Sequence, residues 1–579
     1  PAAAARAFGR RHRAVTAAVH RAFRDFFRPE ATREAPGRRV RLPGLLALRA
    51  TGFAHPERAR ENLRLIVEGR PLVPYAGALR RALERLLPAL LDALWKSPDP
   101  DEALNQFERF LAAAGPRAGL IELLAADPGM LTGLARLCAG GDLLTQLLIA
   151  QPELLTSLGG YGHGGPEMAP KPPAVRPAHA APGRASVPGA PIDRQAFARH
   201  RGARGFRAAL APVFAPALPP GERRDRLRQL KQAEELAVVW RYLLGATSID
   251  RYSREMTALA EAVLAAGGLL ALEALVERHG VPRAPDGRFI PAVLVGLGKL
   301  GGRELTTGSD LDVFLVFAHD GETDGATRVD AHTFWSAFVE RLAGTLGDIT
   351  SAGVAFPVDL RLRPGSKGSG FASSLAAARR YYAEFGDLWE RQTLARARLV
   401  LGDRSLARAV RRLVRDHVYG APLGAEGLKE IAEVRTRMEL ELGKETPGRY
   451  HVKFGRGGLV DVEFLVQALQ LVHGHARPDV RRVNTIAALR GLARVGALPP
   501  ATADALAGHY RFLRRVSAAL RLLSARPPDT LELAGPMPAR VASALGLTSR
   551  EAFLAEYRAR TREVRDIHAR VMATGDGTA

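Results

Sequence analysis

The sequence contains little cysteine, few aromatic residues and no long apolar run. Its one cysteine, Cys138, excludes an internal disulfide and a cysteine-rich metal site, which fits a reducing compartment. No stretch of about 18 uncharged apolar residues occurs, and the N-terminus lacks the charged-then-apolar order of a secretory signal, so we expect a soluble, cytoplasmic protein without a membrane span. Aromatic residues make up only 6% of the chain, which argues against a surface for stacking RNA bases.

Positive charge is in excess but unevenly distributed. The formal net charge is +23, and residues 1–50 contain twelve arginines and three acids. These arginines stand among alanines at helical spacing, with few aromatic residues between them, a pattern typical of solvated helix faces. We therefore expect an acidic protein partner or nucleotide phosphates, and not nucleic acid, to use the excess.

The chain is long enough for several domains, since 47% of its 579 residues are hydrophobic. Leucines recur every three or four residues from 83 to 94, which predicts a helix with one apolar face. Residues 159–191 are instead rich in Gly, Pro, Ala and Ser, which predicts a flexible linker. We expect five regions: a basic helical tail of a preceding domain (1–74), a helical central segment (75–158), the linker (159–192), a domain with N-terminal helices and a small sheet (193–400) and a C-terminal helical bundle (401–579).

The small sheet is expected because three short β-branched or aromatic runs are bounded by glycines. These runs cover residues 290–295, 311–317 and 354–360, with a helix around 331–346 between the last two. From residue 375 the pattern is mostly helical to the end. The fold class is therefore mainly α with a small mixed α/β domain and flanking helical bundles.

Two carboxylates open the second of these strands, in the run Gly308-Ser309-Asp310-Leu311-Asp312. Strand alternation places Asp310 and Asp312 on one face, where they repel each other unless a cation lies between them. A third acid, Asp359, lies in the next strand. Three carboxylates on adjacent strands can hold Mg²⁺ shared with substrate phosphates, although an Asp-x-Asp pair alone is more often a solvated turn.

Several neighbours of the acids are candidates for binding a nucleotide. The small residues Gly308 and Ser309 allow backbone N–H groups to approach phosphate, and Lys299 lies in the same glycine-rich run. Arg361 and Arg363 follow Asp359 at alternate positions, where they could bind triphosphate or simply pair with the aspartates. Lys367 stands in a Gly/Ser turn and could reach phosphate or be exposed.

The arrangement of acids resembles that of the DNA polymerase β-like nucleotidyltransferase superfamily. Longer sequence blocks point to one family within it. Four ordered blocks between about 290 and 471 are similar to those of the glutamine synthetase adenylyltransferase family, in the adenylyltransferase half of its bifunctional enzyme. Residues 75–158 resemble the segment that joins the two halves, and the first residues resemble the end of the deadenylylating half. The blocks are GLGKLGGRELTTGSDLDVFLVF, VDLRLRPGSKGSG, YYAEFGDLWERQTLARARLVLGD and KFGRGGLVDVEFLVQALQL.

This resemblance implies a multifunctional nucleotidyltransferase that uses ATP and Mg²⁺, with 193–400 as its nucleotidyltransferase domain. It implies Asp310, Asp312 and Asp359 as catalytic metal ligands, with Gly308 and Ser309 near the phosphates. It further implies transfer of AMP to a tyrosine of glutamine synthetase, in the regulation of nitrogen assimilation, under control of a PII signal protein and glutamine. One departure is visible: Ser517 stands where the family usually carries a glutamate.

The fourth block opens a helix with a polar stripe whose role the sequence leaves open. The stripe could face the nucleotide cleft or another domain, or form a buried structural network; its members are Glu463, Gln467 and Gln470. The resemblance makes the start of this helix part of the wall beside the active site, through Lys453, Gly457, Gly458 and Asp461.

Four other functions are each suggested by some feature of the sequence. The run Gly296-x-Gly298-x-x-Gly301 matches the dinucleotide-binding fingerprint, but too little chain separates it from Asp310 for a crossover helix. An RNA-directed polymerase β-like nucleotidyltransferase is disfavoured by the low aromatic content. A non-catalytic scaffold is disfavoured because all three acids are present. The closest alternative is phosphorolytic deadenylylation of glutamine synthetase by the same fold. The sequence leaves open the target tyrosine, effector affinities, oligomeric state and whether the chain is a fragment of the bifunctional enzyme.

Overall fold

The computed structural model describes residues 42–70, 73–75, 77–115, 118–140, 142–150, 152, 154–155, 202–362, 364, 370–524 and 529–574. The start of the expected basic tail, the whole linker at 159–192, and both Arg363 and Lys367 lie outside the described residues.

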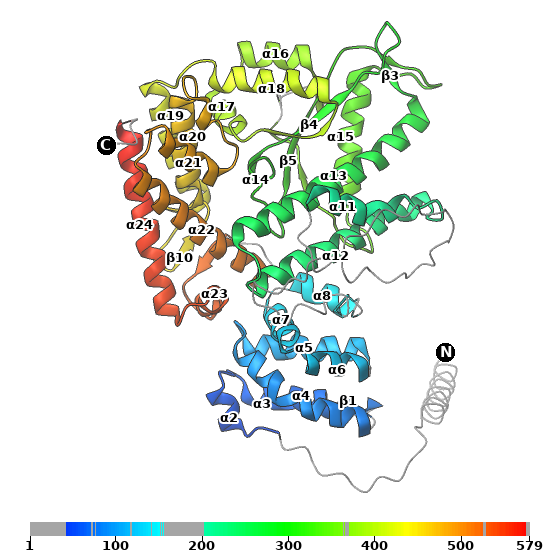
Figure 1. Ribbon diagram of the computed structural model, residues 1–579, viewed down its shortest axis with the longest axis vertical. Helices are drawn as coiled ribbons and strands as arrows, with labels where there is room; N and C mark the ends of the chain where they lie inside the picture. The colour runs from blue at the N-terminus through cyan, green and yellow to red at the C-terminus, as the bar shows by residue number, and fades with distance from the viewer. Residues whose placement is uncertain are drawn as a thin grey trace, which may run out of the picture.

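The region before the linker is a group of packed helices, drawn in blue and cyan in Figure 1. The helical expectation for 75–158 is confirmed for its described part, and the leucine face of α4 is buried around Leu83, Leu86 and Leu90. Asp99 caps α5 by accepting a 3.1 Å hydrogen bond from the Glu102 amide. The elements are α2 (Leu45–Ala50), α3 (Pro56–Glu68), β1 (Gly69–Arg70), β2 (Val73–Pro74), α4 (Gly77–Trp95), α5 (Pro100–Ala114), α6 (Ala118–Ala126), α7 (Pro128–Cys138) and α8 (Asp142–Ala150).

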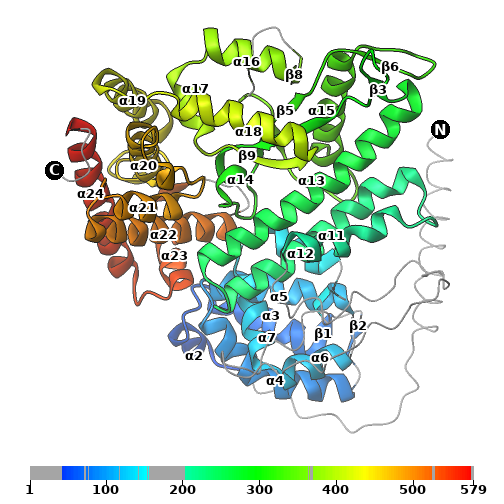
Figure 2. The same cartoon turned by 45° about the horizontal axis from the view of Figure 1, so that its top comes forward.

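A second helical layer, formed by α11 (Ala203–Leu210), α12 (Arg223–Leu243) and α13 (Ile249–His279), connects these helices to the sheet. Gly133 of α7 lies so close to the ring of Trp240 on α12 that a Cβ atom would be 2.7 Å from it. By length and composition α13 could cross a membrane, and 56% of its apolar window is buried inside the protein. It packs on α11, α12 and α15 (Ala331–Gly347), and Figure 2 shows it lying across the middle of the molecule.

The sheet has five strands, in the order β7-β5-β4-β9 with β8 also paired to β5. β4 pairs antiparallel with β5 and β9, whereas β7 and β8 run parallel to β5. The short helix α14 (Gly298–Gly302) connects β4 to the loop before β5. The strands are β4 (Ala292–Gly296), β5 (Leu311–Phe317), β7 (Val358–Asp359), β8 (Ala372–Ser374) and β9 (Arg398–Gly402), and β3 (Pro282–Arg283) forms a separate pair with β6 (Glu322–Thr323).

The third expected strand, residues 354–360, is shorter than its sequence pattern indicates, because only Val358–Asp359 pairs with β5. The preceding residues fold back onto the end of α15, where the amides of Ala355 and Phe356 both donate to the Leu346 carbonyl oxygen. Alternation along a strand therefore does not extend to Arg361, which lies beyond it.

The rest of the chain is almost entirely helical, so the expectation of a mainly α protein with small sheets is confirmed. A second hydrophobic core begins at Val452 and extends to Val571, separate from the core that contains the sheet. The boundary expected at 400 stays a prediction; β9 crosses it. The elements are α16 (Leu375–Glu384), α17 (Leu388–Leu394), α18 (Arg404–Tyr419), α19 (Ala425–Met438), β10 (Arg449–His451), α20 (Leu459–His473), α21 (Thr485–Arg494), α22 (Pro500–Leu523), β11 (Thr530–Glu532), α23 (Met537–Leu545) and α24 (Arg550–Thr574).

Candidate active site

The acids singled out in the sequence meet at one edge of the sheet. Asp312 on β5 and Asp359 on β7 are directly paired residues of two parallel strands. Asp310 lies just before β5 and is exposed. The register thus places the third carboxylate beside the second, as the strand pattern predicts.

Asp312 is the acid most affected by its surroundings. Burial, followed by repulsion from Asp359 and Asp310, raises its pKa to about 6, and two cations, Lys453 and Lys299, work in the opposite direction. The three carboxylates therefore influence one another electrostatically. A hard divalent cation placed between them would remove this repulsion.

Asp359 is held by its neighbour Arg361. The Arg361 amide donates to Asp359 Oδ1 at 2.9 Å, and its Nε donates to Oδ2 at 2.9 Å. These hydrogen bonds from Arg361 are the main reason that the pKa of Asp359 lies below its ordinary value. The Arg361 side chain is 86% exposed, so it can leave the carboxylate at little cost. Of the two roles open to Arg361, the ion pair with aspartate is the one present.

The glycine-rich turn between β4 and β5 allows the backbone to lie against Asp312. Gly298 has a φ of +51°, and a Cβ atom there would be 2.3 Å from Asp312 Oδ2. The Leu297 amide donates to the Asp312 carbonyl oxygen at 2.9 Å. Only glycine combines this backbone conformation with this contact.

The loop before the acids is fixed by hydrogen bonds on both sides. Ser309 is buried, and its hydroxyl accepts from the Thr306 amide at 3.1 Å, so it stabilises the loop from within. The Thr307 amide donates to the Tyr252 hydroxyl on α13 at 3.0 Å. Gly308, with a φ of +71°, is exposed, and its carbonyl oxygen accepts from Arg521 Nη1 at 2.8 Å.

Arg521 belongs to a polar group from the second core that the sequence reasoning missed. Its Nη2 donates to Asp529 Oδ2 at 3.2 Å, and Ser517 donates to Asp529 Oδ1 at 2.7 Å. The departure at Ser517 is thus part of a local network with an acid. Lys299 lies close to this group: burial and then repulsion from Arg521 lower its pKa to about 8.

A buried network joins the sheet domain to the second core and gives the polar stripe of α20 a role. Arg396 forms ion pairs with Glu304 and, at 3.3 Å, with Glu463. The Tyr510 hydroxyl lies 2.8 Å from a carboxylate oxygen of each acid. The Gln467 side chain accepts a hydrogen bond from Gln392. The Gln470 side chain donates to the carbonyl oxygens of Val480 and Arg482. The stripe thus both faces the sheet domain and forms a buried structural network with it.

The start of α20 is likewise held together structurally. Asp461 is buried, forms an ion pair with Arg435 and accepts from the Gly457 amide at 2.7 Å. Gly457 cannot carry a side chain, because a Cβ atom would collide with the Thr561 carbonyl oxygen. Lys453, two residues after β10, is the member of this segment whose charge acts on Asp312.

The donor set at the sheet edge is compatible with Mg²⁺. Within the described ranges, no three His, Cys, Asp or Glu side chains already converge as a metal cage. Burial and the two neighbouring acids nevertheless raise the pKa of Asp312, which a cation would oppose, and carboxylate oxygen is the ligand that Mg²⁺ prefers. Closure of such a site requires Asp359 to exchange its contacts with Arg361 for the ion.

Comparison with known proteins identifies two matching family models. Residues 190–412 match the glutamate-ammonia ligase adenylyltransferase family, and residues 428–572 match the GlnD PII-uridylyltransferase family. The first range contains all three acids and Lys299, and the second contains Lys453, Arg521 and Asp529. The two halves of the candidate site thus fall in separate matched segments.

The chain is also similar to proteins named bifunctional glutamine synthetase adenylyltransferase/adenylyl-removing enzyme. It is 28% identical to that of Bradyrhizobium diazoefficiens over 82% of this chain and 44% of the relative. It is 33% identical to that of Thioalkalivibrio sulfidiphilus over 61% of this chain and 36% of the relative, and 34% identical to that of Xanthomonas campestris pv. campestris over 59% and 37%. The chain therefore spans less than half the length of these relatives, and the resemblance seen in the four sequence blocks is confirmed.

Proposed function

We propose that this chain transfers AMP from ATP to a tyrosine of glutamine synthetase and releases pyrophosphate, because residues 190–412 match the glutamate-ammonia ligase adenylyltransferase family. The observation that carries the proposal is the paired position of Asp312 and Asp359 on adjacent strands inside that range. The five-stranded sheet would then be the palm of a DNA polymerase β-like fold.

We propose Asp310, Asp312 and Asp359 as the ligands of Mg²⁺, which would supply charge neutralisation for the triphosphate and for the attacking tyrosine oxygen. By holding the ion, these carboxylates would position the charge to which the triphosphate binds. Gly298 keeps the Asp312 carboxylate in place, since the backbone there lies against Oδ2. Arg361, once released from Asp359, is free to pair with a phosphate oxygen.

Two lysines near Asp312 are also proposed to bind the phosphates. Lys299 and Lys453 both act on the charge of Asp312, so they lie near the reacting groups. Gly308 and Ser309 are proposed to support the phosphates through the backbone of the loop, because the Ser309 hydroxyl is engaged inside it. Arg363 and Lys367 remain proposed phosphate ligands.

We also propose the other properties that the resemblance to the adenylyltransferase family implies. They are regulation by a PII signal protein and by glutamine, a role in nitrogen assimilation and a cytoplasmic location.

Mass spectrometry of glutamine synthetase, after incubation with this chain, ATP and Mg²⁺, tests the proposal directly. We expect a gain of one AMP per synthetase subunit, located on a tyrosine. A matched reaction with Asp312→Asn should leave the synthetase mass unchanged. No gain with the unaltered chain, or an equal gain with the variant, would reject the proposed activity or the assigned site.

A further inference from the structure

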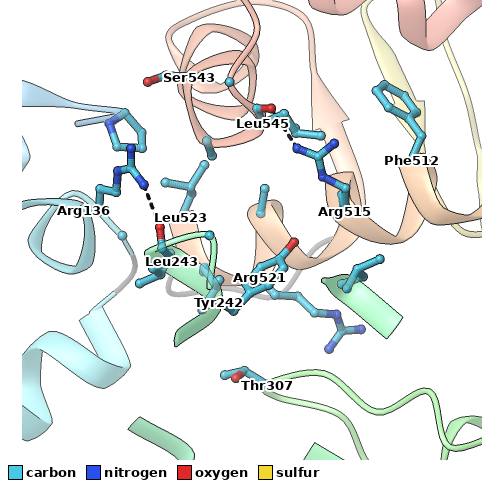
Figure 3. Close-up of a pocket in the computed structure, with 18 of the residues that line it drawn as sticks. Arg136, Tyr242, Leu243, Thr307, Phe512, Arg515, Arg521, Leu523, Ser543 and Leu545 are labelled. Atoms are coloured by element: carbon cyan, nitrogen blue, oxygen red, sulfur yellow. Dashed lines mark hydrogen bonds between the residues drawn. The ribbon is translucent and has the colours of Figure 1, made fainter. Parts of the chain in front are cut away.

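A large cavity lies on the side of the 306–309 loop that faces α12 and α22, and it shares Gly308 with the proposed phosphate site. It has a volume of about 970 Å³ and is enclosed by α7, the end of α12, α22 and α23. Figure 3 shows Arg136 and Arg515 on opposing walls, with Tyr242 and Leu243 between them and Thr307 below. The cavity is within the size range of sites for small organic ligands.

The walls combine apolar surface with an excess of positive charge. Leu243, Phe512, Leu523 and Leu545 form apolar parts of the wall. Among the described residues that line it there is one acid, Glu556, and six cations: Lys96, Arg136, Arg511, Arg515, Arg521 and Arg560.

Two of these cations keep their charge unneutralised. Arg136 Nη1 donates to the Leu243 carbonyl oxygen at 2.7 Å, and Arg515 Nη2 donates to the Leu545 carbonyl oxygen at 2.8 Å. Neither guanidinium forms an ion pair with a carboxylate within the described part of the chain, in contrast to Arg511, which pairs with Asp250 at 2.7 Å. Carbonyl oxygens fix the orientation of a guanidinium and leave donors and net charge available to an anion.

We propose that this cavity binds a small amphipathic anion, an apolar body that carries a phosphate or carboxylate group. The anionic group pairs with Arg515 or Arg136, and the body fills the apolar wall. Binding in this cavity is independent of the proposed function; only an effect on AMP transfer would rest on it.

The cavity is linked to the catalytic loop through aromatic contacts. Tyr242 lines the cavity and stacks on Tyr252 with ring centroids 4.5 Å apart. The Tyr252 hydroxyl accepts the hydrogen bond from the Thr307 amide at 3.0 Å, and both Thr307 and Gly308 line the cavity. A ligand that packs on Tyr242 therefore stabilises the loop that precedes Asp310, and slower exchange of the Thr307 amide reports its presence.

The test uses the full chain and the fluorescent probe 8-anilinonaphthalene-1-sulfonate, which joins an apolar ring system to an anionic group. We expect one saturable site whose affinity falls on the order of tenfold in Arg515→Gln and in Arg136→Gln. Ala519→Trp, which fills the cavity from α22, should remove the site. Arg408→Gln, an exposed arginine on α18, is the matched control and should bind as the unaltered chain does.

Two further measurements locate the probe and distinguish the ligand types. Hydrogen exchange of the segment containing Thr307 should slow when the probe is bound. Phenyl phosphate and phenylacetate, which share an apolar body, serve as competitors, and displacement by one of them identifies the preferred anionic group. Unchanged affinity in both arginine variants, or displacement by neither competitor, would overturn the proposal, even if Ala519→Trp failed to fold.

Discussion

Asp312 is the residue on which the proposed chemistry depends most, because it is paired with Asp359 and repelled by both other acids. We expect Asp310→Asn, Asp312→Asn and Asp359→Asn each to reduce AMP transfer by a factor of roughly 10³, because a lost metal ligand removes charge stabilisation from the transition state. The assay is the rate of AMP incorporation, with circular dichroism as the control for folding. Near-normal activity in any of the three would show that the acid is misassigned.

The same acid should make stability depend on pH when EDTA removes divalent ions. The carboxyl has an ordinary pKa of 3.8 and a folded pKa of about 6, so the folded protein favours the protonated form. Ionisation of Asp312 does not lower the free energy of unfolding at a pH below 3.8. The loss grows as the pH rises from 3.8 to about 6 and is complete above that. Asp312→Asn should therefore raise the free energy of unfolding by about 3 kcal/mol at pH 8 and by only about 1 kcal/mol at pH 4.5.

Urea unfolding at the two pH values measures this difference. Asp320→Asn, an exposed carboxylate on the segment after β5, is the control and should show no such pH-dependent gain. An equal effect of Asp312→Asn at both pH values would contradict the assigned cause.

At residue scale the sequence predicted the acids and could not predict their partners from the second core. The acids could be singled out because local features of the sequence indicate them: a glycine-rich run, short strand patterns and the alternation of side chains. They are Asp310, Asp312 and Asp359. Arg521 contacts Gly308 across 213 residues, and no local pattern encodes such a contact. The ion pair of Arg361 with Asp359 was one of two alternatives that the sequence left open, and the structure shows it formed.

Among the elements, the turn that contains α14 offers a direct test of close packing. In Gly298→Ala the new methyl group would meet Asp312 Oδ2 at 2.3 Å and must displace the carboxylate. We expect transfer to fall by roughly 10² or more, as for a misplacement of a reacting group by about 1 Å. Gly287→Ala is the matched control: its φ is +81° and no atom lies within 4 Å, so it introduces the same kind of backbone strain without a collision.

The rate of AMP transfer, compared between these two alanine variants, separates collision from strain. Equal losses would show that strain alone matters at position 298.

The buried network between the sheet domain and the second core should stabilise the folded protein. Glu304→Gln leaves Arg396 buried with only Glu463 at 3.3 Å to balance its charge. We expect a loss of about 3 kcal/mol in the free energy of unfolding. Asp92→Asn, which removes a pair that is more than half exposed, should cost less than about 1 kcal/mol. Denaturant unfolding measures both, and similar costs would mean that the network contributes little.

For whole elements, periodicity predicted the helices well and the strands less well. The helix expected at 331–346 is α15, and the leucine face of α4 is buried. The strand expected at 354–360 is mostly lost, because Ala355 and Phe356 bond to the end of α15, a tertiary contact that overrides local preference. β9 was not singled out, since its partner β4 lies about a hundred residues earlier.

At the scale of the whole molecule, the direction of the reaction can be tested. The described residues contain one acid set of this kind, at Asp310, Asp312 and Asp359, within the adenylyltransferase match. We expect the chain to adenylylate glutamine synthetase and, when given phosphate, to release no ADP from the adenylylated form. Chromatography of the released nucleotide measures this. Efficient phosphorolysis that disappears in Asp310→Asn would assign the removing reaction to this site.

The bond from Arg521 to Gly308 also determines when during protein synthesis the site can be completed. A ribosome translates the acids first and reaches Arg521 only 213 residues after Gly308. A nascent chain can therefore fold the sheet and display its carboxylates while the loop beside them still lacks its anchor. A product of premature termination before Arg521 carries every acid but lacks this hydrogen bond, so its loop keeps only the contacts within the sheet domain, such as that from the Thr307 amide to the Tyr252 hydroxyl.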